Sequence, residues 1–287
     1  MYTYNRKLTG PYNFDQVLNR LAMDPLNEVS LENKEVKVPL LEKNAPLLVK
    51  IKAIGTFADP EFVISSEAIL PQHVQDKIER TFHWDRALHE IQAHFANTNL
   101  APIFKQHEGT PIVLDYEPYN CLIKCFIHQQ LNLKFAHTLT ERFVHTFGFQ
   151  HEGVWFYPTP EKIAALDYED LTSMQFSRRK AEYIIDTSRL IASGELPLDE
   201  IVLKSDEEIM KTLIKVRGIG PWTVQNLLLF GLGRPNLFPL ADIGIQNALK
   251  KLFDLPNKPT QEEMLEWTKD WEPYLSYASL YLWRSIE

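Results

Sequence analysis

The sequence predicts an α+β protein in which a small mixed domain precedes a helical region. Two early segments, Val36–Leu40 and Leu47–Ile54, alternate apolar and polar residues as strands do. After Pro118 the apolar residues recur at helical spacing almost throughout. We therefore expect an N-terminal α/β domain over residues 1–112 and an all-helical region over residues 113–287.

The N-terminal domain is expected to contain at least one helix beside its strands. In the segment 71–82, Val74, Ile78 and Phe82 lie four residues apart, which places them on one face of a helix. Strands and a helix within one short segment favour a compact α+β unit.

The helical region begins with a long apolar-periodic stretch and continues with helices whose starts are marked by capping residues. The first stretch, Tyr119–Phe147, is expected to break near Leu131-Asn132. The later helices are expected after Thr159 with Pro160 in the first turn, after Ser177 as far as Leu190 with Gly194 as the stop, after Ser205 in a capping box with Glu208, and over Gln261–Trp271 and Leu275–Trp283.

Composition excludes several classes of protein. No run approaches 18 apolar residues, so no transmembrane helix is expected, and the first residues lack the apolar core of a secretory signal. Two cysteines among 287 residues argue against a disulfide framework and fit a reducing cytoplasm. The net charge of −8 counts against non-specific coating of nucleic acid.

The most informative segment is Gly218-Ile219-Gly220, between two expected helices. Glycine at both ends permits positive φ and a close backbone approach, and Pro221 suits the first turn of the next helix. The free N–H groups of such a helix start can bind an anion such as a DNA phosphate. An ordinary helix-turn-helix corner has the same pattern, so these residues alone do not distinguish an anion-binding hairpin from a purely structural turn.

A local excess of positive charge surrounds this segment in an otherwise acidic chain. From Lys211 to Phe253 there are six Lys and Arg residues against one acid, Asp242, a net charge of +5. A second basic cluster follows Ser177, at residues 178–180. Asp242 also precedes an apolar-periodic helix, so it can be a helix N-cap, a functional carboxylate, or both.

Four features in the right order resemble the helix-hairpin-helix (HhH-GPD) superfamily of DNA glycosylases. The hairpin pattern matches at Leu213, Val216, Gly218, Ile219, Gly220 and Thr223, with Val224 where alanine is usual. Asp242 falls at the family's aspartate. Residues 125–130 and the closing segment Trp271–Trp283 resemble family motifs, with Leu275 where arginine is common. The chain is most similar to bacterial 3-methyladenine DNA glycosylase II of the AlkA type.

The resemblance implies hydrolysis of the N-glycosidic bond of alkylated purines, such as 3-methyladenine and 7-methylguanine, in duplex DNA. Asp242 would stabilise an oxocarbenium-like sugar. Bifunctional members carry a lysine where this chain has Trp222, so the enzyme is expected to be monofunctional, with no lyase activity. A cytoplasmic monomer acting at the bacterial nucleoid is expected, with an N-terminal domain built on a TBP-like sheet and two helical lobes that flank the active-site cleft.

The resemblance also assigns roles around the hairpin. Trp222 and Trp283 would line the pocket for a flipped base, and Gln130 would fill the gap that the base leaves. Gly218, Ile219 and Gly220 would bind DNA phosphate. The backbone carbonyls of Ile214, Val216 and Ile219 would hold a structural Na⁺ or K⁺ that bridges to that phosphate.

Two alternatives remain open at this stage, and no cofactor is required for catalysis in any of them. An 8-oxoguanine-type glycosylase shares the architecture, although Trp222 in place of the lysine argues against it. A non-catalytic DNA-binding hairpin module is the other, although Asp242 argues against it. The iron–sulfur branch needs four cysteines, whereas this chain has only Cys121 and Cys125, so no cluster is expected.

Overall fold

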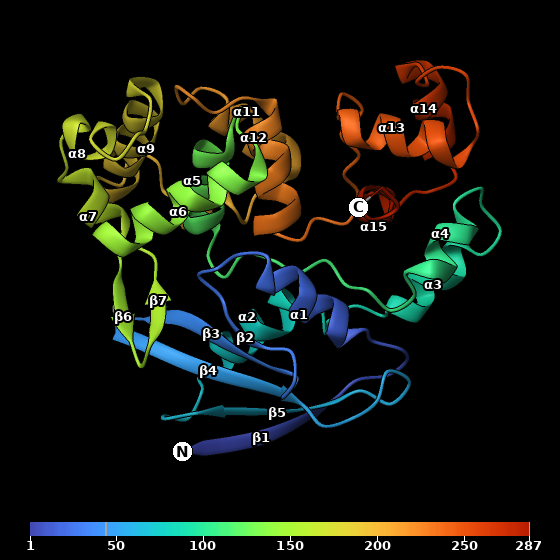
Figure 1. Cartoon of the computed structure of the whole chain (residues 1–287), viewed down its shortest axis with the longest axis horizontal. Helices are drawn as coiled ribbons and strands as arrows, with labels where there is room; N and C mark the ends of the chain where they lie inside the picture. Colours follow the sequence, from blue (N-terminus) through green and yellow to red (C-terminus); the bar gives the residue numbers. More distant parts are fainter. Residues whose placement is uncertain (44, 287) are drawn as a thin grey trace.

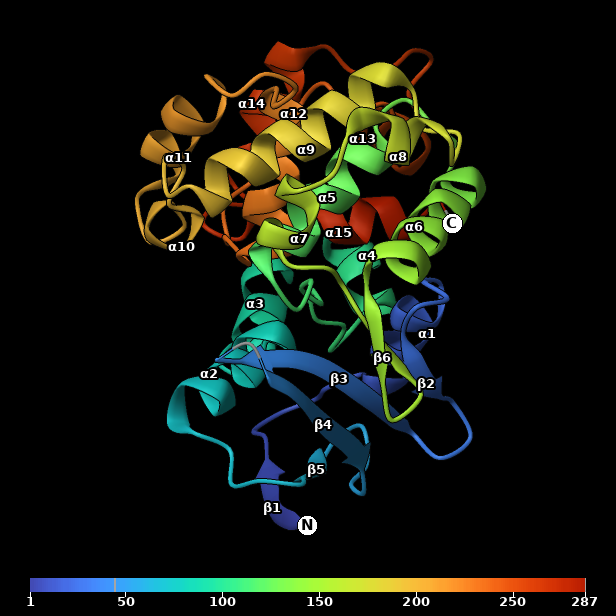
Figure 2. The same ribbon diagram turned by 90° about the vertical axis from the view of Figure 1, so that its left-hand side faces the viewer.

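The computed structural model describes residues 1–43 and 45–286, and it shows a sheet domain beneath a larger helical part (Figures 1 and 2). The α+β class predicted from the sequence is confirmed. One antiparallel sheet has the strand order β1-β5-β4-β3-β2. Its strands are β1 (Tyr2–Lys7), β2 (Glu28–Ser30), β3 (Glu35–Glu42), β4 (Ala45–Ala53) and β5 (Glu61–Ser66).

Alternation along the strands explains which face of the sheet is buried. Val36 and Val38 of β3 pair with Ile51 and Val49 of β4, and all four are buried. The helices of this domain are α1 (Phe14–Ala22), α2 (Gln72–Thr81), α3 (Leu88–Phe95) and α4 (Ala101–Gln106). Both predicted strands and the predicted helix at residues 71–82 are therefore confirmed.

The helical region follows the expected order, with the break between the first two helices where the sequence placed it. Gln130 has a φ of +57° between α5 and α6, and Asn132 caps α6 through its side chain. The elements are α5 (Pro118–His128), α6 (Leu133–Phe147), α7 (Pro160–Ala164), α8 (Tyr168–Thr172), α9 (Arg178–Ala192), α10 (Leu198–Ile201), α11 (Asp206–Leu213), α12 (Pro221–Asn226), the π-helical turn η1 (Leu227–Gly231), α13 (Ile243–Leu252), α14 (Gln261–Thr268) and α15 (Leu275–Arg284).

A small hairpin, β6 (Phe149–His151) and β7 (Val154–Phe156), was not predicted. It descends from the helical part and reaches β3 of the sheet domain (Figure 1). Three-residue strands leave too short an apolar pattern for the sequence to reveal them. None of the helices in the described part of the chain has the length and apolar character needed to cross a membrane.

Two hydrophobic cores organise the molecule, and they do not simply follow chain order. One core holds the buried residues of α5 to α12, such as Phe126 and Leu213. The other joins the sheet domain to the last helices, so that Phe62 of β5 and Trp271 after α14 belong to one cluster. The C-terminal lobe is thus built on the N-terminal domain, and the region α5–α12 forms the opposite lobe.

A buried polar contact ties the sheet domain to α15. His83, which follows α2, places its Nδ1 atom 2.6 Å from the hydroxyl of Tyr277. Burial, reinforced by the charge of Arg86, lowers the pKa of His83 to about 3. The imidazole is therefore neutral in the folded protein at any pH above about 3, whereas an unfolded histidine gains a proton below its ordinary pKa of 6.5.

This difference predicts a pH-dependent loss of stability. Between pH 6.5 and 3 the unfolded chain binds a proton at His83 that the folded chain does not, so stability falls as the pH falls. The largest slope from this group is about 1.4 kcal/mol per pH unit. Urea unfolding at pH 7 and pH 5.5 should show a smaller drop for His83→Gln than for the wild type. His145→Gln, at an exposed site, is the matched control; equal drops in all three proteins would contradict the prediction.

Candidate active site

The predicted hairpin lies between α11 and α12, and its two glycines have different conformations. Gly218 has a φ of +94°, and a β-carbon there would lie 2.3 Å from the ring of Tyr183. Gly220 instead has an extended backbone, with a φ of −103°. Of the two features that glycine permits here, Gly218 uses the positive φ, whereas Gly220 leaves room for a close backbone approach. No atom lies within 4 Å of a β-carbon built on Gly220, so its outer face is open.

A glutamine that the sequence reasoning passed over anchors this hairpin. The side-chain amide of Gln129 donates to the carbonyl of Gly218 at 3.1 Å and to the hydroxyl of Thr223 at 3.0 Å. Its neighbour Gln130, predicted to fill the gap left by a flipped base, is exposed and lies in a turn where its own φ is positive. The end of α5 thus supplies one residue that fixes the hairpin and one that is free to meet a ligand.

Asp242 caps α13 and also bonds to α15. Its Oδ1 atom accepts from the backbone N–H of Ile245 at 2.8 Å and from the indole N–H of Trp283 at 2.9 Å. Within the described residues, Oδ2 has no hydrogen-bond donor. A β-carbon on Gly244 would lie 3.0 Å from Oδ1 and 3.2 Å from the Trp283 ring, so glycine permits this approach. The carboxylate is oriented through one oxygen while the other stays free.

A cavity of about 760 Å³ is lined by Phe230, on which Trp283 stacks. Asp242 is not among its lining residues, and of the two predicted pocket tryptophans only Trp222 is. Trp222, which is 45% exposed, lines the cavity together with Asn226 and Phe230. Trp283 is absent from the lining. It stacks on Phe230 instead, with ring centroids 6.0 Å apart and an interplanar angle of 29°. Trp283 therefore borders this cavity only through Phe230, and its role in a base pocket stays a prediction.

Phe230 is the aromatic residue that the sequence reasoning missed. It lies in η1, contacts Trp283 on one side and lines the cavity on the other. A guanidinium carbon of Arg20, from the N-terminal domain, lies 5.9 Å from its ring centroid. It lies in a π-helical turn, a feature frequent at functional sites, but the apolar run Leu227–Phe230 gives no sign of that turn in the sequence.

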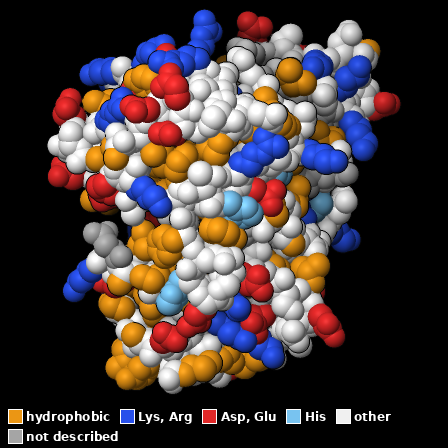
Figure 3. All heavy atoms as spheres, turned by 60° about the vertical axis from the view of Figure 1, so that its left-hand side comes forward, with side chains coloured by type: hydrophobic (Ala, Val, Ile, Leu, Met, Phe, Trp, Pro, Cys, Tyr) orange, Lys and Arg blue, Asp and Glu red, His pale blue; other side chains and the backbone are white. Residues whose placement is uncertain are grey.

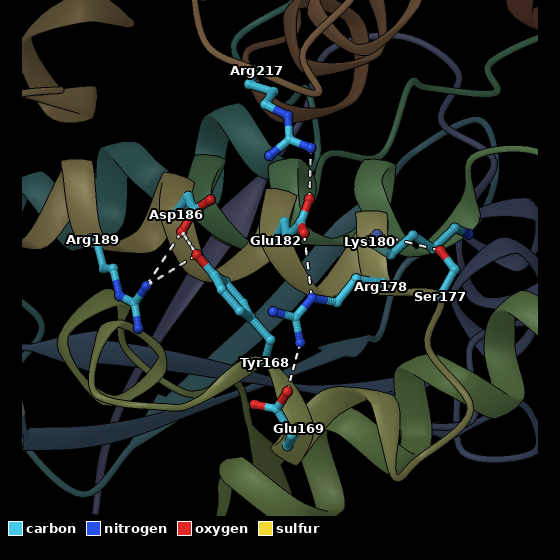
Figure 4. A network of polar contacts seen from close by, with 9 residues as sticks. All are labelled: Tyr168, Glu169, Ser177, Arg178, Lys180, Glu182, Asp186, Arg189 and Arg217. Carbon is cyan, nitrogen blue, oxygen red and sulfur yellow. Dashed lines mark hydrogen bonds and ion pairs between the residues drawn. The ribbon is translucent and has the colours of Figure 1, made fainter.

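The basic footprint is smaller than the sequence count indicated. Figure 4 shows Arg217 and Arg178 both paired with Glu182, at 2.6 and 3.3 Å. Arg178 also reaches Glu169 at 2.7 Å. These carboxylates lie on α8 and α9, outside the sequence window in which the charge was counted. Arg217 of the hairpin and Arg178 of α9 are therefore engaged in ion pairs within the protein.

The cations around the hairpin differ in how free they are to meet a ligand. Lys180 (Figure 4) is not free, because its ammonium donates to the carbonyl of Ile127, and burial lowers its pKa to about 8. Lys215, Lys250 and Lys251 form no ion pair with any described residue. Figure 3 shows most of the Lys and Arg side chains in view over the upper, helical half of the molecule. The helical half of this face would therefore attract a polyanion.

Three backbone carbonyls were predicted to hold a monovalent cation. The carbonyl of Val216 accepts from the N–H of Ile219 at 3.1 Å, which closes the hairpin. A carbonyl oxygen has two lone pairs, so this bond leaves Val216 able to coordinate a hard cation. Ile214 and Ile219 lie at the two ends of the same short loop. Cys121 and Cys125 are both buried in α5 as free thiols.

Leu275 is buried at the start of α15, at 7% exposure. The position where arginine is common in the family motif thus packs into the core here, and it contributes no phosphate contact.

Comparison with known proteins assigns the family. The model of the HhH-GPD superfamily of base excision DNA repair proteins matches residues 123–273. YfjP of Bacillus subtilis is 58% identical over 288 residues and covers the whole of both chains. The structure of a 3-methyladenine DNA glycosylase from Schizosaccharomyces pombe, in complex with abasic DNA, is 30% identical. It covers 68% of this chain and 95% of that one, with a TM-score of 0.59.

The fold of the whole chain also has a solved counterpart. A 3-methyladenine DNA glycosylase from Archaeoglobus fulgidus superposes with a TM-score of 0.85 at 20% identity, covering 98% of this chain and 97% of that one. At this level of identity the likeness concerns the fold, including the N-terminal sheet domain. The family match and the full-length relative go further: this chain belongs to the HhH-GPD superfamily of base excision DNA repair proteins.

Proposed function

We propose that this protein is a monofunctional DNA glycosylase that hydrolyses the N-glycosidic bond of alkylated purines in duplex DNA. The observation that carries the proposal is the geometry of Asp242. One carboxylate oxygen is held by the helix start and by Trp283, and the other has no donor among the described residues. Trp283 in turn stacks on Phe230, which lines the aromatic cavity. The relatives named as 3-methyladenine glycosylases support the choice of substrate class.

In the proposed reaction the damaged base leaves the duplex and enters the cavity, where Trp222 and Phe230 offer stacking surfaces. The C–N bond then breaks, and positive charge develops on the sugar. The free oxygen of Asp242 stabilises that charge and can orient the water that attacks the sugar. A purine alkylated at a ring nitrogen already carries positive charge, so it leaves without a proton from the enzyme.

The hairpin would position the DNA without reading its sequence. The open backbone around Gly220 lets a phosphate approach the free N–H groups at the start of α12. The carbonyls of Ile214, Val216 and Ile219 would hold a Na⁺ or K⁺ that bridges to this phosphate. Gln130, exposed at the end of α5, would fill the space left by the flipped base. The enzyme is proposed to act as a monomer.

Asp242→Asn should abolish base release while the protein stays folded. The amide oxygen can keep both hydrogen bonds to Ile245 and Trp283, so only the charge is lost. Removing an electrostatic interaction made in the transition state costs about two to three orders of magnitude in rate. Single-turnover release of 7-methylguanine from methylated duplex DNA measures it, with Asp270→Asn on an exposed site as the control. Near-wild-type excision by Asp242→Asn would contradict the proposal that Asp242 is the catalytic carboxylate.

Gly220→Ala should weaken binding to every DNA sequence alike without destabilising the fold. The added methyl group meets no protein atom, but it would stand where the phosphate approaches. Gly218→Ala is the contrast, because its β-carbon collides with Tyr183 and should lower the melting temperature. Fluorescence anisotropy at moderate salt compares the dissociation constants. An unchanged constant in folded Gly220→Ala would show that the hairpin is not the DNA anchor.

No covalent intermediate should form between protein and DNA. Trp222 stands where an amine would attack the sugar in a bifunctional enzyme, so borohydride added during the reaction should trap no adduct. Strands should break only after alkali or an abasic-site nuclease. Trp222→Ala should slow excision by removing a stacking surface worth about 1–3 kcal/mol per base. A borohydride-trapped complex of the unmodified protein would contradict the monofunctional mechanism.

A further inference from the structure

The cavity beside Trp222 has a wall that is unusually acidic for a protein that binds DNA. Its lining includes two cations, Arg20 and Lys124, against six carboxylates. Those carboxylates are Asp24, Asp115, Glu117, Glu161, Asp199 and Glu200. With neutral histidines this amounts to a formal charge of −4, or −3 once Lys77, which pairs with Glu117 from outside the lining, is included. A phosphate would be repelled from such a wall, and a cationic ligand would be attracted to it.

The most buried part of this charge is a cluster of three residues from both domains. The ammonium of Lys124, on α5, lies 2.9 Å from a carboxylate oxygen of Asp24 and 2.7 Å from one of Asp115. The three side chains are 22%, 12% and 19% exposed, respectively. Asp24 follows α1 in the N-terminal domain. We call Asp24, Lys124 and Asp115 the acidic cluster, because two negative charges face one positive charge.

The acidic cluster adjoins the aromatic surface proposed to hold the base. The backbone N–H of Asp115 donates to the carbonyl of Phe230 at 2.8 Å. Cys121, one helical turn before Lys124, places its sulfur 3.8 Å from the carbonyl of Asn226, which also lines the cavity. A base that rests against Phe230 therefore lies close to the cluster.

Asp24 and Lys124 keep their charges at neutral pH. Burial acts to raise the pKa of Asp24, but the ammonium of Lys124 and the backbone N–H of Leu26 outweigh it, and the net shift is downward. Burial likewise opposes the charge of Lys124, yet the carboxylates raise its pKa well above its usual range. The excess negative charge is thus a fixed feature of the cavity.

Two histidines of the same cavity do not offset this charge. Burial, with a smaller effect of the neighbouring His137, lowers the pKa of His128 to about 4. Burial also lowers the pKa of His137. Both rings are therefore neutral at pH 7. Arg20 offsets part of the negative charge, because its guanidinium carbon lies 5.9 Å from the centroid of the Phe230 ring. Its side chain is exposed to solvent, where its charge is screened more strongly than that of the buried cluster.

A polar group without a partner points to a ligand here. Tyr116 lines the cavity, and its buried hydroxyl has no hydrogen-bond partner among the described residues. A buried hydroxyl left unpaired costs free energy, which a bound polar molecule can recover. Purine edges carry both donors and acceptors, so they can satisfy such a group.

Resting on the proposed function, we propose that the acidic cluster selects purines that alkylation has made cationic. Asp24 and Asp115 supply the excess negative charge, Lys124 holds the two carboxylates together, and Tyr116 meets the polar edge of the base. Discrimination is then by charge as well as by shape. A neutral purine of similar size would lose its hydration on binding without gaining the electrostatic attraction of the carboxylates.

The test compares a fixed cation with its neutral counterpart. Isothermal titration of the full-length protein would measure binding of 3,9-dimethyladenine, which is cationic, and 9-methyladenine, which is neutral. The wild type should prefer the cation by at least about tenfold. Asp24→Asn should reduce that preference several-fold, whereas Asp15→Asn should leave it unchanged. Asp15 lies on α1 and pairs with Lys34 at an exposed site, so this control removes the same charge from the same segment.

Each outcome decides the proposal. Equal binding of the two purines by the wild type, or no binding of either, would overturn it. So would an unchanged preference in Asp24→Asn. If that variant does not fold, as judged by circular dichroism, Asp115→Asn removes the second carboxylate and is expected to behave alike.

Excision of 7-methylguanine from duplex DNA, measured in parallel on the wild type, tests the proposed function separately. A wild type that prefers the cation but excises nothing would refute the glycosylase assignment alone. A wild type that excises 7-methylguanine but binds both purines equally would refute only the role of the acidic cluster.

Discussion

The site depends on one hydrogen bond, from the indole N–H of Trp283 to Oδ1 of Asp242. Asp242 starts α13 and Trp283 is near the end of α15, so this bond fixes the two helices relative to each other at the point where a carboxylate is exposed. It requires a residue without a side chain at Gly244. It also sets the plane of the Trp283 ring, on which Phe230 stacks from the opposite lobe.

The two-lobe construction explains why the site lies where it does. The C-terminal helices share a core with the sheet domain, and α5–α12 form the other core. Asp242 belongs to the first lobe, whereas Trp222 and the hairpin belong to the second. The N-terminal domain takes part directly, because Arg20 contacts Phe230 and Asp24 pairs with Lys124 across the cavity. It is therefore more than a support for the C-terminal helices.

Charge is distributed so that an acidic protein can approach DNA. Glu182 forms ion pairs with Arg217 and Arg178 in the network of Figure 4. Each of these arginines already faces a carboxylate, so part of its charge is neutralised within the protein. Lys215, Lys250 and Lys251 stay without an ionic partner in the described part of the chain. The cavity wall has the opposite sign, since its lining holds more carboxylates than cations.

The sequence by itself determined what depends on local interactions. Capping residues gave the helix starts at Ser205 and Asp242, and glycine with proline gave the hairpin, because these signals act within a few residues. The assignment of Asp242 as a functional carboxylate stays a prediction, although its geometry suits that role. The tertiary structure decided that Phe230, rather than Trp283, faces the cavity, that Glu182 neutralises Arg217, and that Asp24 meets Lys124. Each of these pairs joins residues far apart in the chain, and no local pattern encodes which side chains a fold brings within a few ångströms.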